Sequence, residues 1–266
     1  MEISFIGTGK AAFNLAKYFK GKEHNIKYAF DVDSKKVEEF SSKFLSKVVS
    51  IETLINDSDM VFLTVNDNMI YELWEKIKKY TNKKNTIFIH CSGAKKGLYE
   101  NEKYHLHSLH PAAPLTGDSE LANICFGLED SGMYKDKIKN FIENIGNQVF
   151  FIPQEKKSQY HLANVVVSNL VLSLFEKGTS YLLNCGLNEE EAIALLMPLA
   201  KENLDNILKK GIKASITGPV SRGDYEVCKN HLEVINKEDE VIYTCLSKNI
   251  LKILGKNKEE FDINIK

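Results

Sequence analysis

Arginine is almost missing from this chain of 266 residues, in which Arg222 is the single arginine among 35 basic residues. The 36 acidic residues nearly cancel the basic ones and leave a formal net charge of −1. Proteins that bind nucleic acid or membrane surfaces through charge normally carry a basic patch and a basic excess. The composition therefore predicts neither a nucleic-acid partner nor a membrane partner, and it leaves Arg222 as the basic residue that needs an explanation.

Closely spaced cysteine pairs and long hydrophobic runs are also missing. The five cysteines are scattered without a Cys-x-x-Cys pair, which favours buried thiols in a reducing compartment over disulfides or a structural zinc site. The chain passes from Met1 directly into the strand-like run Ile3–Ile6, so we expect no secretory signal. The most apolar later stretch, residues 162–175, is too short to span a bilayer. These features predict a cytoplasmic protein.

The first half of the chain alternates short β-like runs with polar segments that suit helices. The strand candidates are Ile3–Ile6, Lys27–Phe30, Met60–Val65, Thr86–Cys91, Leu106–Leu109 and Val149–Ile152. Alternation of this kind, with apolar β-branched runs, is typical of an α/β fold in which helices cover a mostly parallel sheet.

The second half has a different pattern. Helical periodicity extends from about residue 155 to residue 185, where Gly186 can end the helix, and it returns over residues 241–254. We therefore predict a Rossmann-like domain over residues 1–154 and an all-α domain over residues 155–266. The long helix would join the two domains.

A glycine-rich motif follows the first strand candidate and opens a helix. Residues 7–12 read G-x-G-x-x-A, in which the first glycine permits a tight turn and the second lets the backbone approach a pyrophosphate. Unpaired N–H groups at the helix start can then meet the anion. The motif predicts a dinucleotide site that includes Gly7, Thr8, Gly9, Lys10 and Ala11, although a purely structural turn would have the same sequence.

The residues after the second strand candidate bear on the choice of cofactor. Asp31 lies where an acidic residue accepts a hydrogen bond from the adenosine ribose, which favours NAD because the carboxylate repels a 2′-phosphate. Ser34, Lys35 and Lys36 favour the opposite choice, because they could receive that phosphate. The sequence therefore leaves NADP or NAD as the expected cofactor.

Polar residues follow two further strand candidates. Val65, Asn66 and Asp67 come after one strand, and Ser92 comes after the next. The carboxyl ends of parallel strands line the crevice where ligands bind, so Asn66 and Ser92 could face the nicotinamide or the substrate. Such residues also form turns through hydrogen bonds to their own backbone.

Three histidines, His105, His107 and His110, form an H-x-H-x-x-H pattern. Alternate strand residues share one face, so a metal site is conceivable, but no carboxylate pair or cysteine nearby completes a ligand set. We expect no metal. His110 is the better candidate for contact with a ligand, because it ends a strand beside the same crevice, and a buried structural histidine is the alternative.

A polar stripe runs along the long helix. Lys157, His161, Asn164 and Ser168 share one face, with Tyr160 and Asn169 beside them. Burying such groups without partners costs roughly 1–3 kcal/mol each. Either a substrate or hydrogen bonds between domains would therefore satisfy the stripe.

Arg222 lies in the loop sequence Thr-Gly-Pro-Val-Ser-Arg-Gly-Asp, residues 217–224. Glycine and proline constrain this loop, and Asp224 can cap a following helix. A guanidinium binds a carboxylate or a phosphate through two hydrogen bonds, whereas a lysine acts as a point charge. Arg222 is thus a candidate anchor for an anionic substrate group, with a structural ion pair as the alternative.

These segments, taken together, resemble a known family. They are residues 90–94 (HCSGA), His110-Pro111, residues 160–163 (YHLA) with Ser168-Asn169, and residues 217–224 (TGPVSRGD). They resemble the Rossmann-like oxidoreductases with a helical C-terminal domain of unknown function, over almost the whole chain. That family is similar in architecture to pyrroline-5-carboxylate reductase and to the 6-phosphogluconate and β-hydroxyacid dehydrogenases.

The resemblance implies an NADP-type N-terminal domain and oxidoreductase activity. It also implies a helical C-terminal domain, like that of 6-phosphogluconate dehydrogenase, through which two subunits form a homodimer. The sequence departs from the family where Asn66 replaces a proline before Asp67, and Asp31 argues against the implied NADP preference. The apolar long helix that would pair two subunits could equally be buried within one.

We therefore expect hydride transfer between a nicotinamide and a small carbonyl, imine or alcohol substrate, which can carry an anionic group. His161 is the first candidate for the general acid or base, because imidazole titrates near neutrality, and Lys157 is the second. The substrate-binding candidates are Ser92, His110, Asn164, Asn169 and Arg222. A protein that senses a nucleotide without turnover is the alternative, because fold does not imply activity.

Overall fold

A computed structural model describes residues 1–80, 85–100, 104–116 and 118–265. The chain divides into two compact units, Met1–Asn169 and Leu170–Lys266. Each unit is described below by itself. Within the described residues, no helix combines the length and the apolar character needed to cross a membrane.

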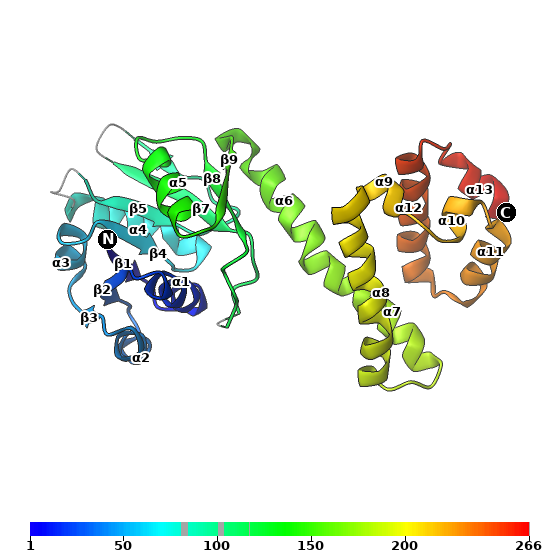
Figure 1. Ribbon diagram of the computed structural model, residues 1–266, viewed down its shortest axis with the longest axis horizontal. Coiled ribbons are helices and arrows are strands. Elements are labelled where there is room, and N and C mark those ends of the chain that lie inside the picture. The colour runs from blue at the N-terminus through cyan, green and yellow to red at the C-terminus, as the bar shows by residue number, and fades with distance from the viewer. Residues whose placement is uncertain (81–84, 101–103, 117, 266) are drawn as a thin grey trace. The chain divides into compact units, whose positions relative to one another are not determined.

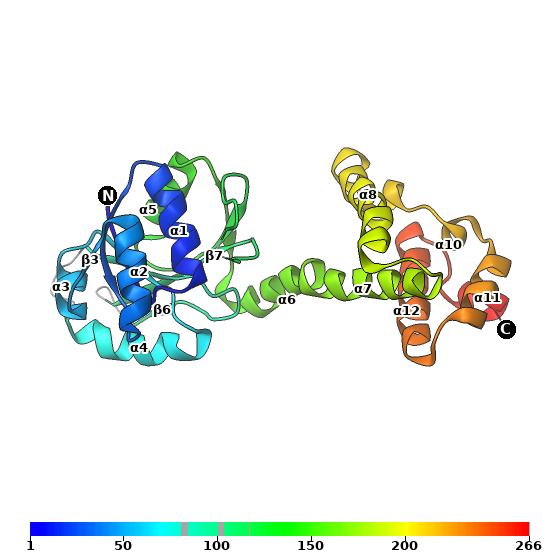
Figure 2. The same cartoon turned by 90° about the horizontal axis from the view of Figure 1, so that it is seen from below.

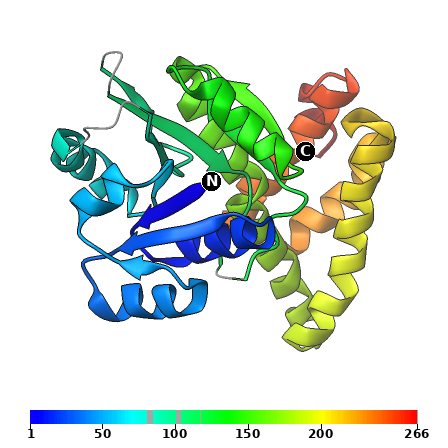
Figure 3. The same cartoon turned by 60° about the vertical axis from the view of Figure 1, so that its left-hand side comes forward.

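The first unit is built on one large sheet. Its described strands are β1 (Glu2–Ile6), β2 (Asn25–Phe30), β3 (Lys47–Val48), β4 (Met60–Leu63), β5 (Ile87–His90), β6 (Leu98–Tyr99), β7 (His105–Pro111), β8 (Cys125–Glu129) and β9 (Gln148–Ile152). Their order across the sheet is β3-β2-β1-β4-β5-β7-β8-β9, and β6 pairs with β7 outside this path. The chain leaves β1 and returns to β2 directly beside it (Figures 1 and 3).

The six strands from β3 to β7 in this order run parallel, whereas β8 and β9 run antiparallel to β7. After β1 the chain builds outward to β2 and β3, and it then crosses to β4 on the other side of β1. The carboxyl ends of β1 and β4 therefore flank the point where the strand order reverses. In open α/β sheets this is where ligands bind.

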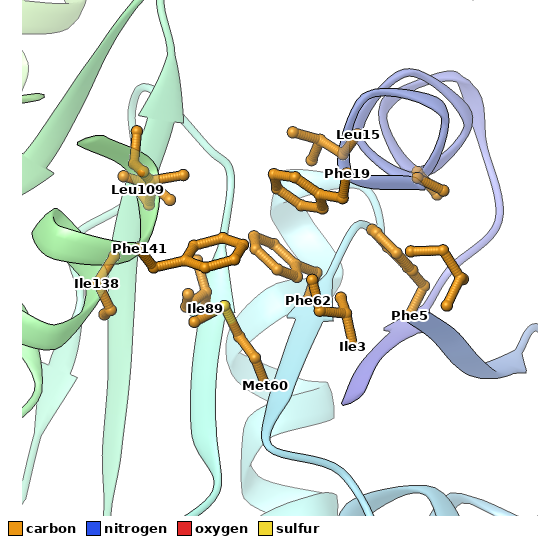
Figure 4. Close-up of a cluster of buried hydrophobic side chains, with 14 of the residues drawn as sticks. Ile3, Phe5, Leu15, Phe19, Met60, Phe62, Ile89, Leu109, Ile138 and Phe141 are labelled. Atoms are coloured by element: carbon orange, nitrogen blue, oxygen red, sulfur yellow. The ribbon is translucent and has the colours of Figure 1, made fainter. Parts of the chain in front are cut away.

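Helices cover both faces of the sheet. They are α1 (Lys10–Gly21), α2 (Ser34–Phe44), α3 (Ile51–Asn56), α4 (Ile70–Ile77) and α5 (Lys135–Asn144). One buried cluster packs α1, α2 and α5 against the strands, and in it Phe19 of α1 contacts both Phe62 of β4 and Phe141 of α5 (Figure 4). A second cluster packs α3 and α4 on the opposite face around Trp74 (Figure 2). The buried aromatic and branched side chains hold the strand ends in place.

The structure confirms the predicted fold class. Each of the six predicted strands is present, with ends that differ by at most two residues. Sequence analysis missed β3, β6 and β8: β3 and β6 are two residues long, and β8 carries a glycine and a glutamate in a five-residue run. Such short or interrupted runs lack a clear apolar period.

The predicted single helix over residues 155–185 is wrong in one respect. The structure has α6 (Lys157–Val167) and α7 (Asn169–Asn184), separated by the turn residue Ser168, whose φ of −114° and ψ of −79° depart from regular helix values. The Ser168 hydroxyl donates to the carbonyl of Asn164 at 2.7 Å, a bond that bends helices. The predicted end is correct, because Gly186 follows with φ +94°.

The boundary between the compact units lies after Asn169, whereas the sequence suggested residue 154. Helix α6 groups with the sheet because Lys157 and Tyr160 form hydrogen bonds with side chains of β7. The second unit holds the rest of α7, followed by α8 (Glu189–Lys210), α9 (Ile212–Ser215), α10 (Pro219–Arg222), α11 (Tyr225–Val234), α12 (Lys237–Leu254) and α13 (Glu259–Ile265). Its buried core joins α10, α11, α12 and α13.

Candidate functional site

The glycine-rich turn lies at the carboxyl end of β1. Gly7 has φ +92°, and a Cβ there would lie 2.8 Å from the carbonyl group of Thr64. Both observations require glycine. Gly9 is the N-cap of α1, where no side chain caps the first turn and a Cβ would meet open space. The turn thus presents helix N–H groups to an open position, as a bound pyrophosphate requires.

A cavity of about 480 Å³ opens beside this turn. Five of the predicted nucleotide-binding residues line it: Gly7, Gly9, Asp31, Val65 and Asn66. Ile51, Met69 and Leu73 supply apolar walls. An apolar slot next to a glycine-rich turn fits the adenosine half of a dinucleotide.

The other predicted nucleotide-binding residues do not line the cavity. Thr8 is buried, and its N–H and hydroxyl both donate to Asp31, at 2.7 and 2.9 Å. Lys10 and Ala11 form the first turn of α1, where their backbone N–H groups are the relevant atoms. Asp67 instead points to Ser92, as described below.

Asp31 is held by its neighbours. One carboxylate oxygen accepts both donors of Thr8, and the other accepts the N–H of Asp33 at 3.0 Å. Burial raises the pKa of the Asp31 carboxyl, but the hydrogen bonds from Thr8 and Asp33 outweigh burial and lower that pKa below its ordinary value. Asp31 is therefore ionised at neutral pH.

A second group of polar side chains gathers at the ends of β5 and β7. The Ser92 hydroxyl donates to a carboxylate oxygen of Asp67 at 2.6 Å and accepts the N–H groups of Ala94 and Lys95. These bonds fix the loop after β5. The turn-forming role of Ser92 is therefore present, whereas its contact with a ligand stays a prediction.

Gly93 brings two histidines close to this loop. A Cβ at Gly93 would lie 2.8 Å from Cδ2 of His161 and 2.9 Å from Nε2 of His110, so only glycine leaves room for both rings. Nδ1 of His110 is 2.8 Å from the Tyr160 hydroxyl. Burial lowers the pKa of His110 to about 4, so its imidazole is neutral at pH 7.

Lys157 begins α6 and has no exposed surface. Its Nζ donates to the Ser108 hydroxyl of β7 at 2.6 Å. Burial lowers the pKa of Lys157 to about 8, and the negative charge of Glu129 opposes that shift. A lysine with this environment changes charge close to neutral pH.

Sequence analysis missed Glu129, the acid that balances this lysine. Glu129 ends β8 and is fully buried, and its carboxylate accepts the N–H of Gly97 at 2.6 Å. Burial raises the pKa of Glu129, although the Gly97 bond and the charge of Lys157 act in the opposite direction. The sequence held one sign of this residue, a glutamate at the end of a short apolar run. Such a position indicates a buried carboxylate, and a buried charged residue almost always has a partner.

The remaining stripe residues are satisfied locally. Nδ2 of Asn164 donates to the carbonyl of Tyr160 at 2.8 Å, and Oδ1 of Asn169 accepts the Ser168 hydroxyl at 3.0 Å. Asn169 is exposed. These bonds use one polar atom of each amide, so contact with a substrate stays a prediction for both residues.

Arg222 belongs to the second unit, where it ends α10. Its side chain is exposed, and Nε donates to Asp224 at 2.8 Å. The structural ion pair considered from the sequence is therefore present, and the pair leaves the terminal guanidinium nitrogens available.

His105 and His107 lie apart from this site. They pack against each other and against Tyr99 on one face of β7, while His110 meets Tyr160. Burial lowers the pKa of His107 to about 3. Among the residues that the structure describes, no three His, Cys, Asp or Glu side chains gather as metal ligands.

Two family models match separate parts of the chain. Residues 2–92 match the family described as NADP oxidoreductase, coenzyme F420-dependent, and residues 124–250 match a domain of unknown function, DUF2520. No curated protein matches the sequence significantly.

Solved structures share the fold over almost the whole chain. A protein from Thermotoga maritima is 27% identical, with a TM-score of 0.73 and coverage of 95% of this chain and 98% of its own. A Bacteroides fragilis protein proposed to be an NADP oxidoreductase is 22% identical, with a TM-score of 0.75 and coverage of 94% and 98%. Pyrroline-5-carboxylate reductase from Streptococcus pyogenes is 13% identical, with a TM-score of 0.65 and coverage of 100% and 99%.

The architecture and the order of the two matched segments agree with the resemblance found in the sequence. The fold is that of a Rossmann-like domain followed by a helical domain; the first part matches the NADP oxidoreductase family and the second part matches the DUF2520 family.

Proposed function

We propose that the protein transfers a hydride between a nicotinamide cofactor and a small carbonyl, imine or alcohol substrate. One observation carries this proposal. The glycine-rich cavity and the cluster around Gly93 both lie at the carboxyl ends of parallel strands of one sheet. A dinucleotide whose adenosine half fills the cavity has its other half available to that cluster.

The cofactor is NADP or NAD, and the residues present fit it. The positive φ of Gly7, the open position at Gly9 and the apolar walls of the cavity match the needs of a dinucleotide. When bound, the nicotinamide supplies or accepts the hydride. The protein's own task is to orient the substrate, exclude water and move one proton.

His161 is our candidate for the proton donor or acceptor. It is half-buried and lies against the Gly93 backbone, and an imidazole can both donate and accept a proton. Ser92 and the neutral imidazole of His110 would orient the reacting group through hydrogen bonds. Asn164 and Asn169 are weaker candidates for substrate contact, because both already bond within the helix.

Lys157 takes a positioning role in this proposal. Its complete burial keeps Nζ away from a substrate, so we assign it to the support of His110 and Tyr160 rather than to direct proton transfer. Arg222 would hold an anionic substrate group, because its terminal nitrogens can form a bidentate pair.

We also propose that the protein is a cytoplasmic homodimer. Many large apolar side chains of α7 and α8 are exposed in one copy, among them Leu172, Leu195, Leu199, Leu204 and Leu208. Large apolar side chains exposed in such number on two helices are typical of a surface that another protein chain covers. The five cysteines are free thiols, which suits a reducing compartment. The expectation that the thiols are buried is wrong for Cys185 and Cys245, which are exposed, and only Cys228 is fully buried.

The test of turnover uses the purified protein with each nicotinamide cofactor and pooled carbonyl, imine and alcohol compounds, followed by absorbance at the nicotinamide band. We expect substrate-dependent cofactor oxidation or reduction, lost in His161→Asn. Tight cofactor binding without turnover, even with metabolites from a cell extract, would favour a nucleotide-sensing protein instead.

A further inference from the structure

Three consecutive residues after β2 form one rim of the nucleotide cavity. Asp31, Val32 and Asp33 all line it, together with Lys36 from the first turn of α2. A 2′-phosphate on the adenosine ribose, the group that distinguishes NADP from NAD, would lie at this rim. The chemistry of these residues therefore decides which cofactor is tolerated.

Asp31 presents negative charge to that position. Three donors hold its carboxylate, two from Thr8 and one from Asp33, so the side chain cannot turn away without losing them. A carboxylate has about four lone-pair positions, which leaves room to accept a ribose hydroxyl. It cannot donate to a phosphate, and it repels one.

Asp33 fills the other place that would suit a phosphate. The N-terminus of a helix attracts anions, and α2 begins at this rim. The Asp33 carboxylate already accepts the N–H groups of Lys35 and Lys36, at 3.1 and 3.3 Å. The chain's own carboxylate therefore occupies the anion position.

The lysines that line the cavity already have acidic partners, and Ser34 and Lys35 do not line it. Two lysines line the cavity among the described residues, and both have acidic partners: Lys36 lies 3.4 Å from Asp33, and Lys76 lies 2.6 Å from Glu72. Between the two aspartates, Val32 is 95% exposed and has no side-chain donor. An exposed valine on an apolar cavity suits contact with an adenosine.

From this arrangement we propose that the protein selects NAD over NADP, through the charge of Asp31 and Asp33 and the lack of a donor at Val32. The inference rests on the proposed function, because it assumes that the cavity receives a dinucleotide. It goes beyond that function by choosing one cofactor, in contrast to the NADP named by the matching family.

Isothermal titration calorimetry of NAD, NADH, NADP and NADPH tests the selection without any substrate. We expect the wild-type protein to bind NAD at least about tenfold more tightly than NADP, a ratio that corresponds to about 1.4 kcal/mol. The double variant Val32→Arg/Asp33→Ser supplies a guanidinium and removes one carboxylate while keeping a residue that caps α2. Its affinity ratio should move at least about tenfold towards NADP.

Val48→Arg is the matched control, because Val48 is an exposed valine of the same unit that does not line the cavity. It should leave the ratio unchanged, and circular dichroism shows whether each variant is folded. Equal or tighter binding of NADP by the wild type overturns the selection and leaves the proposed function standing. An unchanged ratio in a folded double variant overturns the role of the rim. Binding of no nucleotide overturns both proposals.

Discussion

The buried lysine of α6 makes the stability of the first unit depend on pH in a predictable way. The pKa of Lys157 falls from its ordinary value of 10.5 to about 8 because the side chain is buried. The unfolded chain therefore binds more protons than the folded protein between these values, so stability must rise with pH through this window. Below pH 8 the full cost of burying the charge is present, and above pH 10.5 it is gone.

The size of the effect follows from the shift. A difference of about 2.5 pKa units corresponds to about 3 kcal/mol, and about 2 kcal/mol of it is recovered between pH 7 and pH 9.5. Lys157→Met removes the charge and keeps a flexible side chain of similar length. The free energy of unfolding of the Met variant minus that of the wild type should therefore be about 2 kcal/mol more positive at pH 7 than at pH 9.5.

Urea unfolding followed by tryptophan fluorescence measures this difference. Trp74 is the single tryptophan of the chain and is fully buried in the first unit, so it reports on that unit. Lys156→Met removes an exposed lysine from the preceding position and serves as the matched control. The double variant Lys157→Met/Glu129→Gln removes any contribution from titration of Glu129.

The reasoning would be refuted by a pH-independent difference between the Met variant and the wild type. A change below about 0.5 kcal/mol is within the scatter expected for independent sites. Such a result would mean that the Lys157 ammonium is solvated or fully compensated by Glu129, and the positioning role proposed for Lys157 would lose its electrostatic basis.

Three further substitutions test the candidate site. His161→Asn should lower kcat by about 100-fold or more while the calorimetric cofactor Kd is unchanged, and full activity would exclude His161 from proton transfer. Gly93→Ala places a methyl group within 3 Å of His110 and His161, so kcat and the melting temperature should both fall; a wild-type melting curve would contradict this packing. Arg222→Lys keeps the charge but loses the bidentate geometry, so KM should rise about tenfold with kcat less affected, whereas unchanged kinetics would leave Arg222 with only its Asp224 pair.

Local pattern accounts for most of what was predicted correctly. Apolar β-branched runs require burial on both faces of a sheet, so they identify parallel strands without any knowledge of contacts. The glycine-rich turn of residues 7–9 was also recognisable from local sequence, because the positive φ at Gly7 favours glycine over other residues. Gly186 likewise ended its helix as expected.

The candidate site required the tertiary structure, because its members meet only through the sheet. Glu129 lies on a strand that sequence analysis missed, and its burial beside Lys157 depends on the packing of β8 next to β7. The break at Ser168 depends on one side-chain hydrogen bond that helical periodicity does not reveal. Asn164 bonds to the carbonyl of Tyr160 and Asn169 to the hydroxyl of Ser168, contacts that residue spacing alone does not reveal.

The sequence by itself determined the α/β fold and the glycine-rich turn after the first strand, and it singled out Asp31, since each depends on residue type and spacing along a short segment. It did not decide between NAD and NADP, because Asp31 favours NAD while the nearby Lys35 and Lys36 favour NADP. Only the tertiary structure decided which of these charges face the cavity and which are already paired, since that depends on the geometry of α2 and on the hydrogen bonds of Asp33.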